Sequence, residues 1–93
     1  MENLQDQSIK PLSRNDMVGE QIDQELFLYD ESSGVVHSLN GGAALVWFLC
    51  DGTRNAASIA EEIADTFSLE NQEVLADVRE ALAKFQELDM LES

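Results

Sequence analysis

The sequence contains one uninterrupted apolar run, from Ala43 to Cys50, in a chain that is otherwise strongly acidic. The chain has 93 residues, and its 19 aspartates and glutamates against 5 lysines and arginines give a formal net charge of -14. The run is too short to cross a bilayer, which takes about 20 residues, so other parts of the chain must cover it. Apolar side chains would point in every direction around a helix of this composition. We therefore expect a central helix that is enclosed on most sides.

Three segments before this run have the length and composition of β-strands: residues 17–22, 25–30 and 35–39. In the second of them, Leu26 and Leu28 alternate with aromatic residues, so the two leucines share one face of a sheet. Residues 31–34 read Glu-Ser-Ser-Gly, which is typical of a turn. The second and third segments are therefore expected to form an antiparallel hairpin.

Helices are expected in the rest of the chain. Asn40 can cap a helix from residue 41 to residue 50 or 51, because its side chain can accept a hydrogen bond from a free N–H group of the first turn. Asn55 can cap a second helix, in which large apolar residues recur every four positions as far as Phe67. A third helix follows. Strands followed by three helices predict an α+β fold in which the apolar helix lies between the sheet and two amphipathic helices.

The third helix is the longest, and we expect either Ser68 or Asn71 to cap it and the helix to end near Asp89. Its apolar stripe is wide, because leucines follow directly on Val74 and Ala81. A strand at the edge of a sheet, such as residues 35–39, offers unpaired N–H and C=O groups. The sequence therefore predicts a groove in which an extended peptide could add a strand to that edge, with the third helix as the far wall.

The length fits a single domain, which we expect to span residues 11–93 after a flexible tail over residues 1–10. The N-terminus lacks the basic start and apolar stretch of a secretory signal. The one cysteine, Cys50, lies within the apolar run, where a buried, reduced thiol is expected. These features favour a cytoplasmic protein.

The acidic composition disfavours two classes of partner. Nucleic-acid-binding proteins gain most of their affinity from lysines and arginines that face phosphates, and anionic membrane surfaces also attract basic residues. The chain has few of either residue. The sequence therefore predicts no nucleic acid and no membrane as a partner, and favours a neutral or basic one.

No catalytic, metal or cofactor site is predicted. His37 is the only histidine, and no serine or cysteine is spaced for a catalytic pair with it. One cysteine and one histidine cannot form a tetrahedral zinc site. The Gly41-Gly42 pair lacks the GxGxxG or GK[ST] context of a phosphate-binding loop. The carboxylates are scattered over predicted helix surfaces.

The stretch LYDESSGVVHSLNGGAALVWFLCDGTRN, residues 28–55, resembles the PqqD-like family, and the resemblance continues through the two amphipathic helices from about residue 25 to residue 91. The features that carry it are Asp30, Ser33-Gly34, Leu39-Asn40, Ala44, Trp47, Asp51-Gly52-Thr53, Asp77-Val78 and Leu88 to Leu91. Members of the family are peptide chaperones, or recognition elements, for ribosomally made and modified peptides. The resemblance implies a three-stranded antiparallel sheet followed by a three-helix, winged helix-turn-helix-like bundle.

The resemblance also implies where a peptide would bind. The leader segment of a precursor peptide would add a strand to the third strand, with side chains entering the cleft against the third helix. The implied peptide-binding residues are Val35, Val36, His37, Ser38, Leu39, Leu75, Val78, Arg79 and Leu82. Arg79 would pair either with an acidic residue of the leader or with acidic neighbours on its own helix.

The implied function is delivery of the bound precursor to a modifying enzyme, such as a radical S-adenosylmethionine enzyme, or to a leader peptidase. Members that serve pyrroloquinoline quinone synthesis usually have a Pro-Glu step between the second and third strands. Residues 31–34 lack it, which favours another peptide pathway. Two alternatives remain open from the residues alone: a homodimer formed through the exposed strand, and a winged-helix protein that binds DNA.

Overall fold

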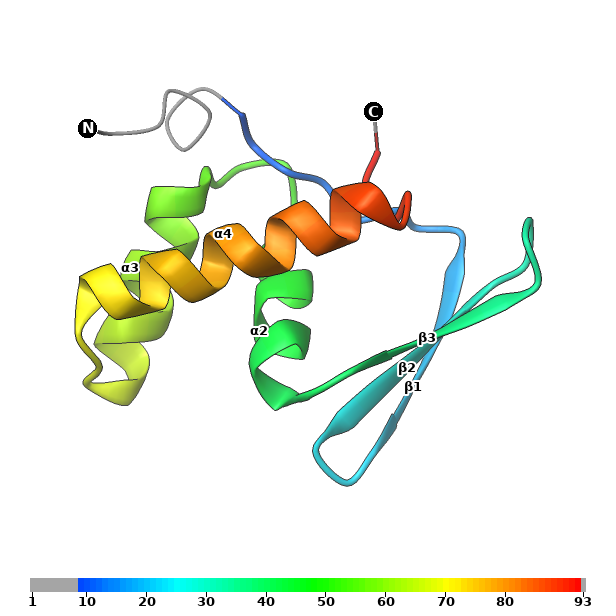
Figure 1. The fold of residues 1–93 in the computed structure, drawn as a ribbon, viewed down its shortest axis with the longest axis horizontal. Coiled ribbons are helices and arrows are strands. Elements are labelled where there is room, and N and C mark those ends of the chain that lie inside the picture. Colours follow the sequence, from blue (N-terminus) through cyan, green and yellow to red (C-terminus); the bar gives the residue numbers. More distant parts are fainter. Residues whose placement is uncertain (1–8, 93) are drawn as a thin grey trace.

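The structure, a computed structural model, describes residues 9–92, so the first eight residues of the predicted flexible tail lie outside the described residues. Figure 1 shows a sheet followed by helices, as an α+β fold requires. The elements, in chain order, are β1 (Met17–Ile22), β2 (Glu25–Asp30), β3 (Val35–Leu39), α2 (Gly41–Leu49), α3 (Ala56–Phe67) and α4 (Asn71–Glu87). The predicted strands and helices are confirmed, with small shifts at the helix ends.

The sheet is antiparallel and has the order β1-β2-β3, so β3 lies at an edge. Leu28 of β2 pairs with Gly19 of β1 and with His37 of β3, and Leu26 pairs with Leu39. Paired residues share a face of the sheet, and Leu26, Leu28 and Leu39 are all buried. This inner face packs on the helices. The register therefore determines which side chains of β3 point toward the helices and which point away from them.

The turn between β2 and β3 has the predicted hairpin geometry. Gly34 adopts a φ of +76°, in the left-handed region that glycine enters without steric cost. Its N–H donates a hydrogen bond of 2.8 Å to the carbonyl of Asp30. The loop therefore spans residues 31–34, as predicted.

Asparagine caps begin two of the helices, as predicted. The side-chain oxygen of Asn40 accepts a 2.9 Å hydrogen bond from the N–H of Ala43, and that of Asn55 accepts one of 2.9 Å from Ser58. Each bond satisfies a backbone donor that the helix itself leaves free. The start of α2 is therefore tied directly to the end of β3.

The predicted cap of α4 is wrong. Its N-cap is Glu70, whose carboxylate accepts hydrogen bonds of 3.3 Å from the N–H of Gln72 and 3.1 Å from that of Glu73. Ser68 instead ends α3, with a left-handed φ of 55°. A longer acidic side chain can reach the same donors as a short one, and its charge favours the positive end of the helix dipole.

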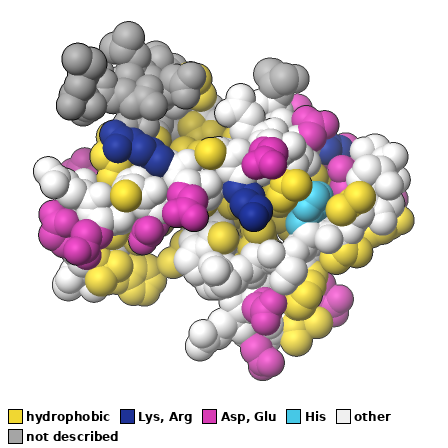
Figure 2. Space-filling model, viewed as in Figure 1, with side chains coloured by type: hydrophobic (Ala, Val, Ile, Leu, Met, Phe, Trp, Pro, Cys, Tyr) yellow, Lys and Arg dark blue, Asp and Glu magenta, His cyan; other side chains and the backbone are white. Residues whose placement is uncertain are grey.

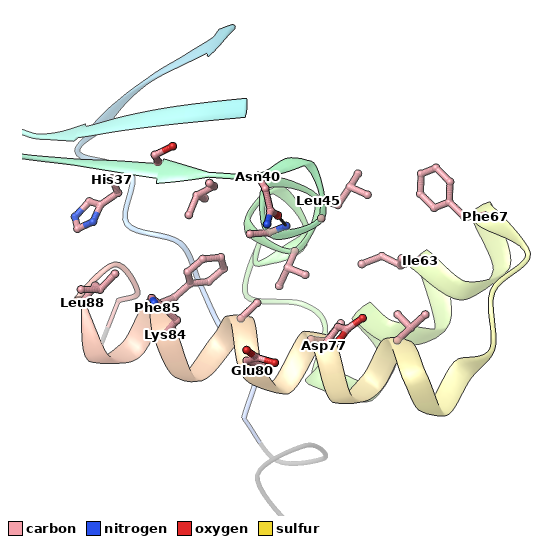
Figure 3. A pocket seen from close by; sticks show the side chains of 18 of the residues that line it. His37, Asn40, Leu45, Ile63, Phe67, Asp77, Glu80, Lys84, Phe85 and Leu88 are labelled. Carbon is pink, nitrogen blue, oxygen red and sulfur yellow. Dashed lines mark hydrogen bonds between the residues drawn. The ribbon is translucent and has the colours of Figure 1, made fainter. Parts of the chain in front are cut away.

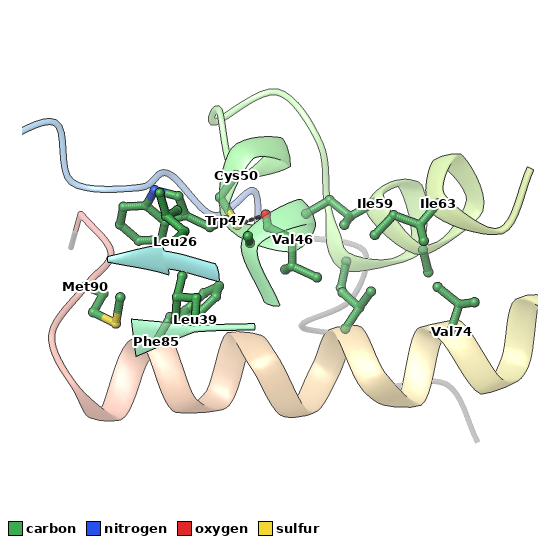
Figure 4. Close-up of a cluster of buried hydrophobic side chains, with 14 of the residues drawn as sticks. Leu26, Leu39, Val46, Trp47, Cys50, Ile59, Ile63, Val74, Phe85 and Met90 are labelled. Carbon is green, nitrogen blue, oxygen red and sulfur yellow. Dashed lines mark hydrogen bonds between the residues drawn. The ribbon is translucent and has the colours of Figure 1, made fainter. Parts of the chain in front are cut away.

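The core is built around α2 (Figure 4). Trp47 of α2 meets Phe85 of α4 edge to face, with 5.5 Å between the ring centroids. Phe85, Ile59, Met90 and Val78 are the largest fully buried side chains. The hydrophobic face of the sheet, α2 and α4 thus share one core. No helix in residues 9–92 has both the length and the apolar composition that crossing a membrane requires.

The expected enclosure of α2 is wrong on one side. Leu45 is 37% exposed and Phe48 is 60% exposed, although Ala44, Val46 and Trp47 are buried. Leu45 and Phe48 are three positions apart and share a helix face, and each of them lines an open cleft. Two large apolar side chains of α2 are therefore left exposed by the rest of the protein.

The segment before β1 packs against the end of α2 and the C-terminal residues. The N–H of Ser13 donates to the carbonyl of Cys50 at 2.8 Å, and that of Arg14 donates to Met90 at 3.1 Å. The N–H of Glu92, near the end of the chain, donates to Leu12 at 2.7 Å. The extended N-terminal segment therefore joins the end of α2 to the C-terminal residues, which the sequence did not indicate.

Candidate functional site

A groove with a volume of about 1040 Å³ lies between β3 and α4 (Figure 3). Residues of α2, of α3 and of the α3–α4 connection also line it, and α2 lies beside the middle of the groove. The residues that line it are Val36, His37, Ser38, Leu39, Asn40, Gly42, Ala43, Leu45, Val46, Ile63, Phe67, Leu69, Val74, Asp77, Val78, Glu80, Ala81, Lys84, Phe85 and Leu88. A space of this size is at the upper end of the usual range for ligand sites.

One wall of the groove is the edge of the sheet. Among residues 9–92, β3 pairs with β2 and with no other strand, so its second edge has main-chain donors and acceptors without a strand partner. Four of its residues, Val36 to Leu39, line the groove. The side chain of His37 shares the inner face with Leu28 and points toward α4 (Figure 3).

The opposite wall is one face of α4. Val74, Val78, Ala81, Phe85 and Leu88 recur at three- and four-residue steps and line the groove. This spacing places them in one stripe along the helix. Val74, Val78 and Phe85 are buried, so they also belong to the core. The wall is therefore rigid, because the same residues hold the helix in place.

The end of the groove near α3 is apolar and open. Phe67 is 52% exposed and Leu69 is 54% exposed, and both line the groove with Leu45 and Ile63. Figure 3 shows Leu45, Ile63 and Phe67 at the same end. Large apolar side chains that stay open to solvent are typical of interaction sites. This end can therefore accept an apolar side chain of a ligand.

The charged residues of the groove lie mainly along the exposed side of α4. Asp77 and Glu80 line it near the middle, and Lys84 lies closer to His37 (Figure 3). Lys84 is the single lysine or arginine among the lining residues, and within residues 9–92 it forms no ion pair. The groove thus has one cationic position beside the sheet and acidic positions farther along the helix.

The structure brings together some of the residues that the sequence assigned to the site. Five of the nine line the groove: Val36, His37, Ser38, Leu39 and Val78. Val35 does not line it; this residue opens β3 at the turn and is 47% exposed. Whether any of the nine binds a peptide stays a prediction.

Leu75, Arg79 and Leu82 do not line the groove, and a role for them in peptide binding stays a prediction. They lie along α4 at spacings of four and three, on the flank away from Asp77 and Lys84. Leu75 and Leu82 pack against the core as half-buried residues, and Arg79 is exposed. The apolar stripe of α4 is wide enough to serve the core on one flank and the groove on the other.

The sequence reasoning missed several lining residues. The sequence predicts that Leu45 is enclosed and that Phe67 belongs to the apolar stripe of α3. The signal for Phe67 was present, since Leu69 follows it in the short connection to α4, where two large apolar residues have little to cover them. Lys84 shares helical spacing with Asp77 and Ala81, but nothing in the sequence says which flank of α4 is open.

The cysteine of the chain is not placed as a reactive nucleophile. Cys50 is buried, and its thiol donates a 3.1 Å hydrogen bond to the carbonyl of Val46 (Figure 4). Burial raises the pKa of the Cys50 thiol to about 12, and a thiol that stays protonated is a poor nucleophile. In residues 9–92, no three histidine, cysteine, aspartate or glutamate side chains lie together as metal ligands would.

Two solved structures are similar in fold to this chain. One is TbiB1 in complex with the TbiA(beta) leader peptide, with a TM-score of 0.74 and 22% identity over 88% of this chain and 95% of that chain. The other is lasso peptide synthetase B1 complexed with the leader peptide, with a TM-score of 0.75 and 21% identity over 90% of this chain and 99% of that chain. None of the curated proteins compared matches the sequence.

The sequence itself matches a family model. The family is described as coenzyme PQQ synthesis protein D (PqqD), and the match covers residues 25–91. These residues include β2, β3, α2, α3 and α4, and therefore every described element that lines the groove. The chain belongs to the PqqD family.

Proposed function

We propose that this protein is a non-catalytic peptide chaperone. It binds the leader segment of a ribosomally synthesised precursor peptide as an additional strand beside β3 and presents the precursor to a modifying enzyme. The observation that supports this most strongly is the groove, in which a strand that pairs on one side only within residues 9–92 faces an apolar helix wall. This arrangement can bind an extended peptide as an additional strand.

Strand addition divides recognition between two kinds of contact. Main-chain hydrogen bonds to the free edge of β3 supply affinity, and every second side chain of the peptide turns into the groove. At about 1.5 Å per residue, the helix from Val74 to Leu88 is roughly 21 Å long, which an extended peptide covers with about six residues. An apolar side chain of the peptide would occupy the end formed by Leu45 and Phe67.

The similar structures favour one kind of precursor. Both are complexes of B1-type proteins with leader peptides, and one is named for a lasso peptide synthetase. We therefore propose a lasso-type precursor, and a leader peptidase as the modifying enzyme that receives it. A radical S-adenosylmethionine enzyme is the alternative recipient within the family. We also propose that this step takes place in the cytoplasm, where ribosomes release the precursor.

A DNA-binding winged helix receives less support. The candidate recognition helix, α4, carries four acidic residues against two basic ones, Arg79 and Lys84. Phosphate contacts need the opposite balance. The face of α4 with the longest apolar stripe is also turned toward β3 and the core, so it is not available to a DNA groove.

Hydrogen exchange tests strand addition directly. In an antiparallel edge strand, every second N–H points away from the sheet. We expect the leader peptide to protect alternate amides between residues 35 and 39 and to leave those already bonded to β2 unchanged. Calorimetry should give a dissociation constant in the micromolar range or tighter, and a peptide of scrambled sequence is the control. Absence of both heat and alternating protection would contradict the proposal.

A further inference from the structure

The face of the sheet turned away from the helices carries an apolar row. Tyr29 of β2 pairs with Val18 of β1 on one side and Val36 of β3 on the other. These three side chains, the outer row, are exposed: Val18 by 56%, Tyr29 by 41% and Val36 by 59%. The row crosses all three strands and reaches the edge at which the peptide would add.

No described element covers this outer face. Figure 1 shows the helices on the other side of the sheet, where Leu26 and Leu28 are buried. Phe27, next to the outer row on β2, is half-buried, and Ile22 of β1 is 51% exposed. A contiguous group of exposed apolar side chains on a small acidic domain is typical of a protein–protein contact.

The charges around the outer face have one sign. Residues 15–39 contain six aspartates and glutamates and no lysine or arginine. Arg14 forms ion pairs with two of them, Asp16 and Asp30. The other four are exposed and form no ion pair within residues 9–92: Glu20, Asp23, Glu25 and Glu31. Figure 2 shows the same excess of acidic over basic side chains on the visible face of the molecule.

We propose that the outer face of the sheet is the docking surface for the modifying enzyme, which meets it with a basic and apolar surface. This inference rests on the proposed function. Charge complementarity selects the occupant: a second copy of this chain would bring four unpaired acids against four, and like charges across an interface are repulsive. A basic partner gains from the same residues, while the outer row supplies the apolar centre of the contact.

The bound peptide would extend this surface. A peptide strand beside β3 turns half of its side chains into the groove and the other half outward, in line with Val36. The enzyme would then contact the outer row and the outward side chains of the peptide together. It would therefore bind the loaded protein more tightly than the empty one, which prevents empty protein from competing for the enzyme.

The test uses the full chain, its leader peptide and the purified modifying enzyme encoded beside the chain and its precursor. Tyr29→Thr truncates the centre of the outer row and replaces tyrosine by a β-branched residue that is also favoured in strands, with Tyr29→Phe as its control. Glu20→Lys reverses one outer charge, with Glu61→Lys, on an exposed position of α3, as its control. Val36 is left unchanged because it borders both surfaces.

We expect Tyr29→Thr and Glu20→Lys each to weaken enzyme binding to the loaded protein about tenfold, while the controls bind as the wild type does. Leader affinity should be the same in all five proteins. We also expect the wild type to bind the enzyme at least about tenfold more tightly when loaded, and added salt to weaken that binding.

The outcomes separate the inference from the proposed function. If the leader binds and the outer-face variants bind the enzyme as tightly as their controls do, the docking surface is wrong and the chaperone function stands. If the leader does not bind the wild type, the proposed function fails and the inference fails with it. If the outer-face variants instead dissociate a dimer of this chain in sedimentation, the occupant is a second copy and the inference is overturned.

Discussion

Among residues 9–92, Asp30 is the one charged residue that is buried. It accepts a 2.7 Å hydrogen bond from the hydroxyl of Ser32 and two from the guanidinium of Arg14, at 3.1 and 3.2 Å. Arg14 also donates to the carbonyl of Asp89 at 2.9 Å. The Asp30 carboxylate and Arg14 together thus connect the N-terminal segment, the β2–β3 turn and the residues after α4. These contacts hold the turn that leads into β3 in place.

The same contacts predict a pH dependence. The Ser32 hydroxyl, followed by the Arg14 guanidinium, holds the pKa of Asp30 well below its ordinary value of 3.8, although burial acts in the opposite direction. The unfolded chain therefore takes up a proton at this carboxyl at a higher pH than the folded protein does. The stability that Asp30 contributes is present above about pH 4 and is lost as the pH falls further.

We expect Asp30→Asn to lower the melting temperature at neutral pH, because Arg14 loses its charged partner. The difference from wild type should narrow as the pH is lowered from about 5 to about 2.5, since Asp30 of the unfolded wild-type chain takes up its proton in that range and the folded protein does not. Thermal unfolding followed by circular dichroism measures both effects. Asp65→Asn, at an exposed position of α3, is the control. A constant difference at every pH would contradict this account of Asp30.

At the scale of secondary-structure elements, α4 has two apolar flanks with different uses. Leu75 and Leu82 complete the core on one flank, whereas Ala81 and Leu88 line the groove on the other. Ala81 is a small residue at the middle of the groove wall. Its small size leaves space that a peptide side chain can fill. Ala83, two residues later, is exposed on the solvent side of the helix.

A matched pair of substitutions tests this division. Ala81→Trp would fill the groove, and we expect it to weaken leader binding at least about tenfold, because the peptide and the new side chain compete for one volume. Ala83→Trp adds the same side chain on the solvent side of α4 and should bind as the wild type does. Calorimetry measures the affinities, and circular dichroism checks that both variants fold. Equal affinities in the two variants would show that the peptide lies elsewhere.

At the scale of the whole molecule, the net charge of -14 acts on every encounter. An exposed sheet edge can pair with a guest peptide or with the same edge of another copy. Two copies would repel each other at long range, since each carries the same large charge. The charge therefore protects the edge of β3 from self-association and leaves it open to a peptide.

We expect the protein to sediment as a monomer at about 150 mM salt. Charges farther apart than about 8 Å are largely screened at this salt concentration, but the acidic residues of two copies would still repel each other at contact. It should remain monomeric when the leader peptide is added, with only the mass of the peptide gained. A tight dimer that persists with the peptide would favour the alternative of a structural homodimer. Sedimentation over a tenfold range of protein concentration distinguishes the two.

The sequence by itself determined the elements and their order. The alternation around Leu26 and Leu28 indicated a strand with one buried face, and Asn40 and Asn55 marked where helices begin. These are local properties, set by the period of the side chains and by the free N–H groups of a first turn. The structure also places β3 at an edge of the sheet, as the sequence analysis expects.

Only the tertiary structure decided which surfaces stay open. Leu75 and Phe67 are equally apolar in the sequence, yet the first packs on the core and the second lines the groove. The difference depends on how far α4 is rotated about its axis and on how far β3 stands from it. Those two quantities are set by the packing of the whole core, including the N-terminal segment through Arg14, and no local pattern in the chain encodes them.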